Sequence, residues 1–213
     1  YVSFYLGDGS RAEGYFIRSA KMMPEFFWNY YNLGVMAFSK GNLPKAREFL
    51  QAAVRVSPEM SVKFLLTSRV FFPLVAEAGY SPKTFFEEIS AGYADAYKML
   101  TMIEWTSRNF PQAMVLAQAG LKAASTDEDR ALFLYFIGSS LLQSGEIPKA
   151  IQVLEECLRL DPQNPEALNS MAMVMTAAGK EDLAKEFLTR AKAAQKSRGS
   201  VLPTSKDFKI RVF

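Results

Sequence analysis

Few side chains in this 213-residue sequence are of the types that catalyse reactions or bind metals. The sequence contains no histidine and one cysteine, Cys157. Without histidine there is no histidine general base, no serine–histidine triad and no histidine metal ligand. One cysteine allows neither an intrachain disulfide nor a cysteine-rich metal site. These classes of enzyme and metal site are therefore excluded.

The remaining reactive-looking clusters have simpler explanations. Glu155 and Glu156, and the acidic residues 127–129, are typical of a solvated face or a helix N-terminus, where acidic groups are favourable. The Gly-Asp-Gly of residues 7–9 is not followed by the Gly-Lys-Ser/Thr of a phosphate-binding loop. Because no histidine can activate Cys157, we interpret it as a small buried apolar residue. We predict that the chain is not an enzyme and binds neither a cofactor nor a metal.

The charge balance is close to neutral. The sequence has 25 Lys and Arg against 22 Asp and Glu, and hydrophobic residues make up 49% of it. Such a composition excludes wholesale disorder and gives no reason to expect nucleic acid or an anionic membrane as a partner. No run of 18 residues is free of charge, so we predict no transmembrane helix. The single cysteine fits a reducing compartment, so we favour the cytoplasm, with a membrane-associated complex as the alternative.

The sequence repeats itself. When residues 30–58 are laid over residues 134–162, Gly34 meets Gly138, and Leu-Pro-Lys-Ala meets Ile-Pro-Lys-Ala. Further alanines, at positions 12 and 184, lie 34 residues from the alanines of these runs. A period near 34 residues indicates an array of stacked supersecondary units.

The repeated positions resemble the tetratricopeptide repeat family along nearly the whole chain. The second repeat supplies Tyr30, Leu33, Gly34, Gly41, Ala46, Leu50, Ala53 and Pro58. The fifth supplies Leu134, Ile137, Gly138, Leu141, Gly145, Ala150, Leu154, Cys157 and Pro162. The resemblance implies an all-α fold, an α-solenoid of helix–turn–helix repeats that forms a right-handed superhelix.

The predicted repeat array spans residues 1–198. Its repeats are about residues 1–26 (truncated), 27–60, 61–93, 94–127, 131–164 and 165–198, and an extended tail follows at 199–213. The first repeat lacks its first helix and begins with aromatic residues. We therefore expect more protein, either another repeat or a membrane anchor, to precede residue 1.

Local residue types support paired helices independently of the resemblance. Gly34 and Gly138 stand where two helices of a repeat would cross, and small residues allow close approach there. Gly41 and Gly145 suit a helix C-terminus that needs a positive φ. Pro44, Pro111 and Pro148 fall in the first turn of a second helix, where a missing N–H costs little.

In the family that the sequence resembles, the first helices of the repeats line a concave groove that holds peptides. The resemblance implies a partner-binding groove lined by Trp28, Tyr31, Asn32, Phe38, Lys98, Met102, Trp105, Tyr135, Phe136 and Asn169. These side chains are largely aromatic, with a methionine among them. They favour an apolar or amphipathic helix, or a peptide, as the bound segment. The alternative is that the aromatic residues pack against each other or against the tail.

A second binding mode of the family is not favoured. Some members grip an acidic C-terminal tail with a clamp of Lys, Asn and Arg side chains. Here Lys98, Asn32 and Asn169 belong to separate repeats, and Tyr31 and Tyr135 stand where a clamp lysine would be. The clamp is absent or incomplete.

Two segments depart from the repeat pattern. Residues 61–79 are mostly apolar, and we predict a buried helix bent at Pro73, with a membrane-contacting helix as the alternative. Residues 207–213 alternate apolar and charged side chains, as an extended segment does. We expect Phe208, Ile210 and Val212 to dock near Leu183 and Leu188 or on a neighbouring subunit. The alternative is a frayed tail.

The sequence therefore predicts a non-enzymatic scaffold or adaptor that binds a segment of a partner protein. A permanent structural or assembly subunit of a larger, membrane-associated complex is the alternative, with the membrane reached only through a missing N-terminal region or a partner. A regulatory domain of an enzyme is the third interpretation. The partner's identity and the oligomeric state are not predicted.

Overall fold

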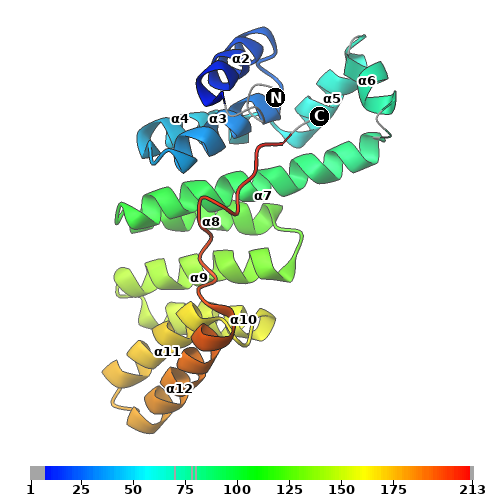
Figure 1. Cartoon of the computed structure of the whole chain (residues 1–213). Helices are drawn as coiled ribbons and strands as arrows, with labels where there is room; N and C mark the ends of the chain where they lie inside the picture. The colour runs from blue at the N-terminus through cyan, green and yellow to red at the C-terminus, as the bar shows by residue number, and fades with distance from the viewer. Residues whose placement is uncertain (1–7, 70, 78, 80, 212–213) are drawn as a thin grey trace. The chain divides into compact units, whose positions relative to one another are not determined.

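The computed structural model describes residues 8–69, 71–77, 79 and 81–211, and every regular element in these ranges is an α-helix (Figure 1). The helices are α2 (Gly9–Met22), α3 (Phe27–Ser39), α4 (Leu43–Arg55), α5 (Pro58–Thr67), α6 (Phe71–Glu77), α7 (Pro82–Thr106), α8 (Phe110–Ala123), α9 (Asp127–Gln143), α10 (Ile147–Leu160), α11 (Pro165–Ala177) and α12 (Glu181–Arg198). The predicted all-α fold is confirmed. The aromatic start of the chain, which suggested protein before residue 1, lies outside the described residues.

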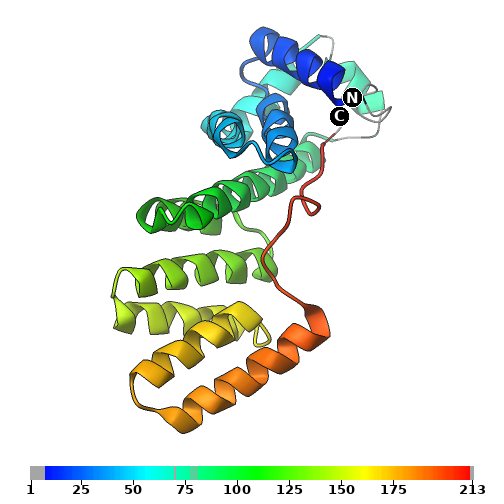
Figure 2. The ribbon, with the colours of Figure 1, turned by 60° about the vertical axis from the view of Figure 1, so that its left-hand side comes forward.

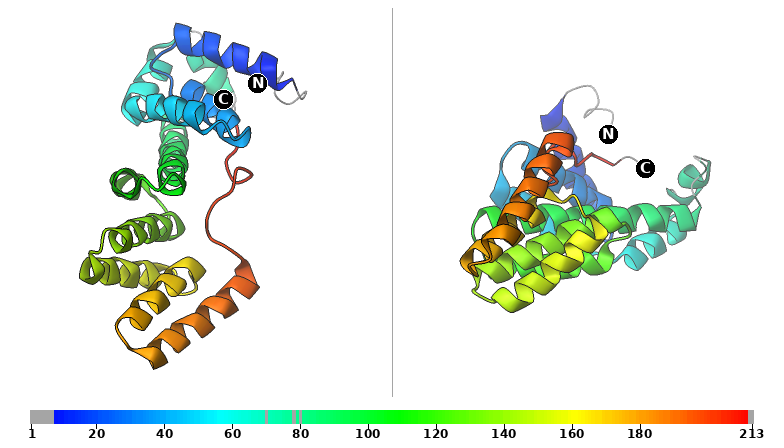
Figure 3. Two further views of the ribbon diagram at one scale, coloured as in Figure 1. Left: turned by 90° about the vertical axis from the view of Figure 1, so that its left-hand side faces the viewer. Right: turned by 90° about the horizontal axis from the view of Figure 1, so that it is seen from below.

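The chain forms two compact units. The N-terminal unit comprises Tyr1–Leu100 together with Thr204–Phe213, and the C-terminal unit comprises Thr101–Pro203. The chain passes from one unit to the other within α7 and again between Pro203 and Thr204. Figure 3 shows the helices from two further sides.

The helix pairs α3–α4, α9–α10 and α11–α12 turn through the same backbone motif, and Figure 2 shows the last pair side by side. In each pair a glycine with positive φ follows the first helix, at Gly41, Gly145 and Gly179. The backbone N–H of the residue after each glycine donates to a carbonyl in the last turn of the first helix. In the first pair, Asn42 N–H donates to the Ala37 carbonyl at 2.9 Å. Glycine suits this left-handed conformation because it has no Cβ. The predicted positive φ at Gly41 and Gly145 is confirmed.

The end of α7 uses the same motif without a glycine. Arg108 has φ 59°, its N–H donates to the Trp105 carbonyl at 3.0 Å, and Asn109 N–H donates to the Glu104 carbonyl at 2.9 Å. The Asn109 side chain also donates to the Glu104 carboxylate at 2.8 Å. The tight turn into α8 therefore requires Arg108 to adopt the left-handed backbone conformation, which is unfavourable for a residue with a Cβ.

Aromatic side chains fill the core of the N-terminal unit. Phe27, Trp28 and Tyr31 of α3 are fully buried, and the Trp28 and Tyr31 rings meet edge to face at 5.1 Å. Gly92 of α7 makes room for them, because a Cβ at this position would lie 2.4 Å from Trp28. The buried Ser61 hydroxyl accepts from Phe27 N–H at 3.3 Å and so ties α5 to the start of α3.

The core of the C-terminal unit is built around α9, whose residues 131–141 are all buried. Gly120 of α8 faces Phe133, and a Cβ on the glycine would lie 2.3 Å from the ring. Gly138 faces Leu154 of α10 in the same way, at 2.8 Å. The prediction that small residues occupy the helix crossings is confirmed at Gly138, and at Gly34, where a Cβ would lie 2.6 Å from Leu50.

The prediction for residues 61–79 is wrong. Instead of one buried helix bent at Pro73, the segment contains α5 and α6, and α5 ends where Ser68 takes an extended conformation. Leu66 and Phe72 are exposed rather than buried. Among the described residues, no helix combines the length and the apolar character needed to cross a membrane.

Helix α7 is a single helix of 25 residues. The repeat boundary predicted between residues 93 and 94 falls inside it. The repeat pattern of the sequence therefore does not mark a helix end at that position.

Replacing Arg108 by glycine should raise the free energy of unfolding by about 0.5–1 kcal/mol, because the left-handed conformation costs glycine nothing. Urea denaturation measures the change. The matched control is Ala178→Gly, at a helix end with φ −82°, where no gain is expected. Equal effects at the two positions would contradict the strain at Arg108.

Gly120→Ala should destabilise the chain by about 1–3 kcal/mol, because the new methyl group overlaps the Phe133 ring. The control is Gly14→Ala in α2, where nothing lies within 4 Å of the added Cβ. Helix propensity alone should make that variant more stable by about 0.5–1 kcal/mol. Opposite signs in thermal or urea unfolding are expected, and a stabilising Gly120→Ala would refute the close approach.

Candidate partner-binding groove

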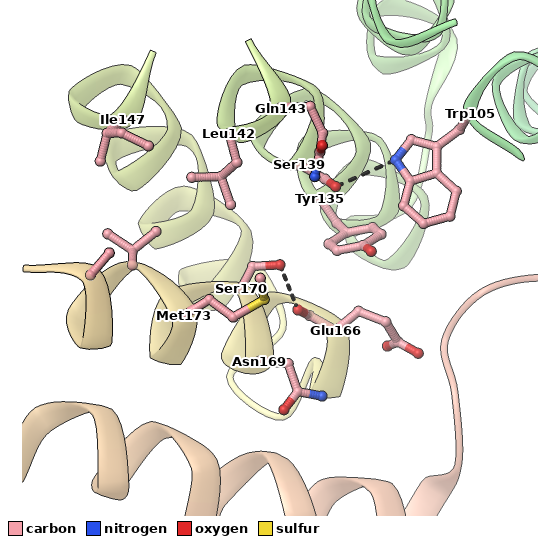
Figure 4. Close-up of a pocket in the computed structure, with 12 residues that line it drawn as sticks. Trp105, Tyr135, Ser139, Leu142, Gln143, Ile147, Glu166, Asn169, Ser170 and Met173 are labelled. Carbon is pink, nitrogen blue, oxygen red and sulfur yellow. Dashed lines mark hydrogen bonds between the residues drawn. The ribbon is translucent and has the colours of Figure 1, made fainter. Parts of the chain in front are cut away.

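A pocket of about 470 Å³ opens in the C-terminal unit, between the end of α7 and the helices α9 and α11 (Figure 4). Its walls are mainly apolar and aromatic, with a few polar groups. They are formed by Trp105, Tyr135, Ser139, Leu142, Gln143, Ile147, Glu166, Asn169, Ser170, Met173, Val174 and Ala177. The size and composition are those of a site that binds an apolar group and orients it with a few polar contacts.

Trp105 is positioned by contacts with α9. Its indole N–H donates to the Ser139 hydroxyl at 3.4 Å. Its ring meets Phe136 edge to face at 5.9 Å and lies 6.5 Å from Tyr135. Figure 4 shows Trp105 and Tyr135 together on one side of the pocket. These contacts fix the indole, and the Trp105 residue as a whole is half-buried.

Helix α11 supplies the opposite wall. Its N-cap, Asn164, accepts from Ala167 N–H at 2.9 Å, which fixes where the helix begins. From there Glu166, Asn169 and Met173 follow at three- and four-residue steps and therefore share one face. Met173 is 69% exposed, a high value for an apolar side chain.

Two polar groups define the electrostatics of the pocket. Burial raises the pKa of Tyr135 to about 12, so its phenol stays protonated and can donate a hydrogen bond at neutral pH. The Glu166 carboxylate accepts from Val201 N–H at 3.3 Å and from the Ser200 hydroxyl. The carboxylate thereby holds the start of the C-terminal tail beside α11 (Figure 4).

The structure brings Trp105, Tyr135 and Asn169 of the predicted groove together in this pocket. Phe136 is 1% exposed and its ring contacts the Trp105 ring edge to face, so its selection as a surface residue needs correction. Met102 is half-buried and does not line the pocket.

Three predicted groove residues of the N-terminal unit, Trp28, Tyr31 and Asn32, are fully buried, and Phe38 and Lys98 are half-buried. Trp28 is fully buried against Gly92 and is unavailable to a partner, which corrects its selection. Tyr31 donates to Asp95 at 3.4 Å, and Lys98 pairs with the same carboxylate at 2.8 Å.

Asn32 and Phe38 both contact the C-terminal tail. Asn32 bonds to the backbone of Arg211, and the Phe38 ring meets the Phe208 ring edge to face at 5.8 Å. The predicted docking near Leu183 and Leu188 is wrong, since Phe208 packs in the N-terminal unit and both leucines are exposed.

The predicted apolar face of the tail is correct for part of the segment. Phe208 is buried and Ile210 packs against the core cluster of the N-terminal unit, whereas Lys209 between them is exposed. The prediction for Val212 lies outside the described residues.

The ten predicted groove residues include three of the twelve that line the pocket and leave out the other nine, among them Ile147 and Val174. Ile147 is the first residue of α10, after the turn at Gly145, and so lies outside the first helices from which the groove residues were chosen. The contact between Asn32 and Arg211 was also missed, because the two residues are 179 positions apart and neither carries a local signal.

The environment of Cys157 disfavours reactivity of its thiol. Its thiol is buried and donates to the Ala131 carbonyl at 3.1 Å. Burial raises the pKa of Cys157 to about 12, which disfavours the nucleophilic thiolate. In the part of the chain that the structure describes, no three His, Cys, Asp or Glu side chains are grouped to hold a metal ion.

Comparison with known proteins identifies repeats and a fold. One family model described as tetratricopeptide repeat matches residues 3–61 and 102–165, and a second with the same description matches residues 141–200. A crystal structure of MamA is similar at 18% identity over 92% of this chain and 94% of that chain, with a TM-score of 0.64. The structure of YrrB, described as a TPR protein with an unusual peptide-binding site, is similar at 16% identity. The match covers 88% of this chain and 95% of that chain, with a TM-score of 0.43. No curated protein gave a significant match.

Cys157 should resist thiol reagents in the folded chain. At pH 8 a thiol with an ordinary pKa near 8.5 is partly ionised, whereas the raised pKa keeps Cys157 protonated. Reaction with a disulfide reagent should be at least about a hundredfold slower in buffer than in urea, since each pKa unit lowers the thiolate fraction tenfold. Similar rates in the two conditions would show that the thiol is accessible and ionised.

Proposed function

The chain belongs to the tetratricopeptide repeat family, and we propose that it is a protein–protein interaction module whose C-terminal unit binds an apolar segment of a partner protein. Members of this family are generally interaction modules without catalytic activity. The buried, protonated state of Cys157 agrees with such a role.

The observation that carries this proposal is the exposed apolar surface of the pocket. Met173 is 69% exposed and Ile147 is 41% exposed, and both line the same cavity as the half-buried Trp105. Single exposed apolar residues are common on protein surfaces, but here several meet in one concavity. Covering such a surface is favourable by about 25 cal/mol for each Å² of apolar area removed from water.

The chemistry of the walls describes the partner segment. An aliphatic or aromatic side chain fits between Trp105 and Met173, and the unbranched methionine can adapt to its shape. The protonated hydroxyl of Tyr135 offers a donor to a carbonyl or carboxylate of the segment, and the exposed Asn169 amide offers both a donor and an acceptor. An amphipathic helix with its apolar face toward α9 and α11 meets these requirements.

Met173→Glu should abolish binding without unfolding the chain, because the side chain is exposed and a carboxylate would enter an apolar site beside Glu166. The probes are peptides selected from a random display library on the full wild-type chain. The matched control is Met22→Glu, at an exposed methionine of α2 in the other unit. Affinities for the selected peptides should fall at least about tenfold, or 1.4 kcal/mol, in the first variant only.

Circular dichroism melting of both variants separates lost binding from lost folding. Selected peptides that bind Met173→Glu as well as wild type would remove this pocket as the partner site. A selection that yields no peptide above background would count against the proposal in the same way.

A further inference from the structure

A second surface, in the N-terminal unit, already holds an extended peptide segment, and that segment belongs to the chain itself. Residues 204–211 belong to this unit and contain neither helix nor strand. They begin with a turn in which Thr204 N–H and the Thr204 hydroxyl donate to the Asp207 carboxylate at 2.6 and 2.9 Å. These bonds lower the pKa of Asp207, so that its carboxylate stays ionised.

One buried side chain, that of Asn32, forms two hydrogen bonds with the backbone of the segment. The Asn32 amide nitrogen donates to the Arg211 carbonyl at 2.9 Å, and Arg211 N–H donates to the Asn32 side-chain oxygen at 2.9 Å. Both backbone groups of one residue are thus satisfied by a single amide, as a neighbouring strand would satisfy them. Such contacts recognise an extended backbone independently of its side chains.

Two apolar side chains of the segment are seated beside Asn32. Phe208 is 6% exposed and meets Phe38 of α3 edge to face. Ile210 packs against the core cluster that contains Phe16 and Leu33. Lys209 between them is exposed, so the segment alternates between the protein and water with the period of a strand.

A carboxylate selects the charge at the end of the segment. Asp95 of α7 lies 3.7 Å from the Arg211 guanidinium and 2.8 Å from Lys98. Tyr31 donates to the same carboxylate, and burial together with Asp95 raises the pKa of Tyr31 far above its ordinary value, so that it remains a donor. Asp95 is little exposed and is already paired with Lys98, so Arg211 is its second and more distant cation, and an acidic side chain at this position would lose that contact.

We propose that the N-terminal unit carries a binding site for extended segments of the pattern Phe-x-Ile-Arg, that residues 208–211 of the chain occupy it, and that a segment of the same pattern on another protein binds only after they leave. This site is distinct from the pocket of the C-terminal unit and does not rest on the function proposed for it. The four recognition features are the Phe38 ring, the apolar cluster under Ile210, the Asn32 amide and the Asp95 carboxylate.

The test compares two double variants of the full chain. Phe208→Ala with Ile210→Ala removes the buried side chains and should release the segment. Lys206→Ala with Lys209→Ala changes the same number of residues in the same segment at exposed positions and should leave it in place. Hydrogen exchange measured by mass spectrometry should show residues 204–211 protected in wild type and in the lysine variant, and unprotected in the released variant.

A labelled peptide of residues 203–211 then tests the emptied site. It should bind the released variant and should bind wild type and the lysine variant at least about tenfold more weakly, a difference of 1.4 kcal/mol. Asn32→Leu in the released variant should abolish binding, whereas Gln118→Leu, at an exposed amide side chain of α8 in the other unit, should not.

Changes in the peptide avoid any effect on folding. N-methylation of the Arg211 amide removes the hydrogen that Asn32 accepts, and Arg211→Glu places a negative charge beside Asp95. Each should weaken binding to the released variant at least about tenfold.

The proposal would be overturned if the peptide bound wild type and the released variant equally, or bound neither of them. Unchanged affinity after N-methylation, or rapid exchange of residues 204–211 in wild type, would overturn it as well. Loss of protection on dilution of wild type would show that the segment binds a second copy, and it would overturn occupation by the chain's own segment.

Discussion

Close approach between helices, made available by the absence of a Cβ, is the constraint on which the rest of this structure depends. At Gly92 and Gly120 the hydrogen faces an aromatic ring, and at Gly34 and Gly138 it faces a leucine of the paired helix. Because the helices lie this close, large side chains such as Trp28 are enclosed completely. The enclosed rings in turn fix which faces of α3, α9 and α11 remain available for recognition.

The two recognition surfaces use these faces differently. In the C-terminal unit, Trp105 and Met173 leave apolar surface open around a pocket with a protonated phenol and a carboxylate near its edge. In the N-terminal unit, Asn32 and Phe38 are covered by residues of the same chain. One family fold thus presents an open pocket in one unit and, in the other, a surface that residues of the same chain cover.

Much of the fold follows from local sequence signals, and most of the long-range contacts do not. The 34-residue period, the glycines that end helices and the prolines that begin them act within a few residues of their position, which is why the paired helices could be predicted. The break between α5 and α6 at Ser68 was missed because no glycine marks it, and Gly79 with its positive φ comes only after α6. The alignment of the repeats correctly predicted three pocket residues, Trp105, Tyr135 and Asn169. The same alignment selected Trp28, which is buried because Gly92 of α7 lets that helix pack directly on its ring. The partner of Arg211 depends on residues 179 positions away, beyond any local pattern.

The covalent link between residues 204–211 and the end of α12 sets a threshold for any competitor. A ligand on the same chain as its site acts at an effective concentration set by the connecting chain, whatever the concentration of the protein. A free segment with the same four contacts would have to exceed that concentration to displace the tethered one. Weak encounters with the many Phe-x-Ile-Arg sequences of a cell are therefore filtered out. A partner that binds at a second place on the chain, and so becomes tethered itself, competes on equal terms.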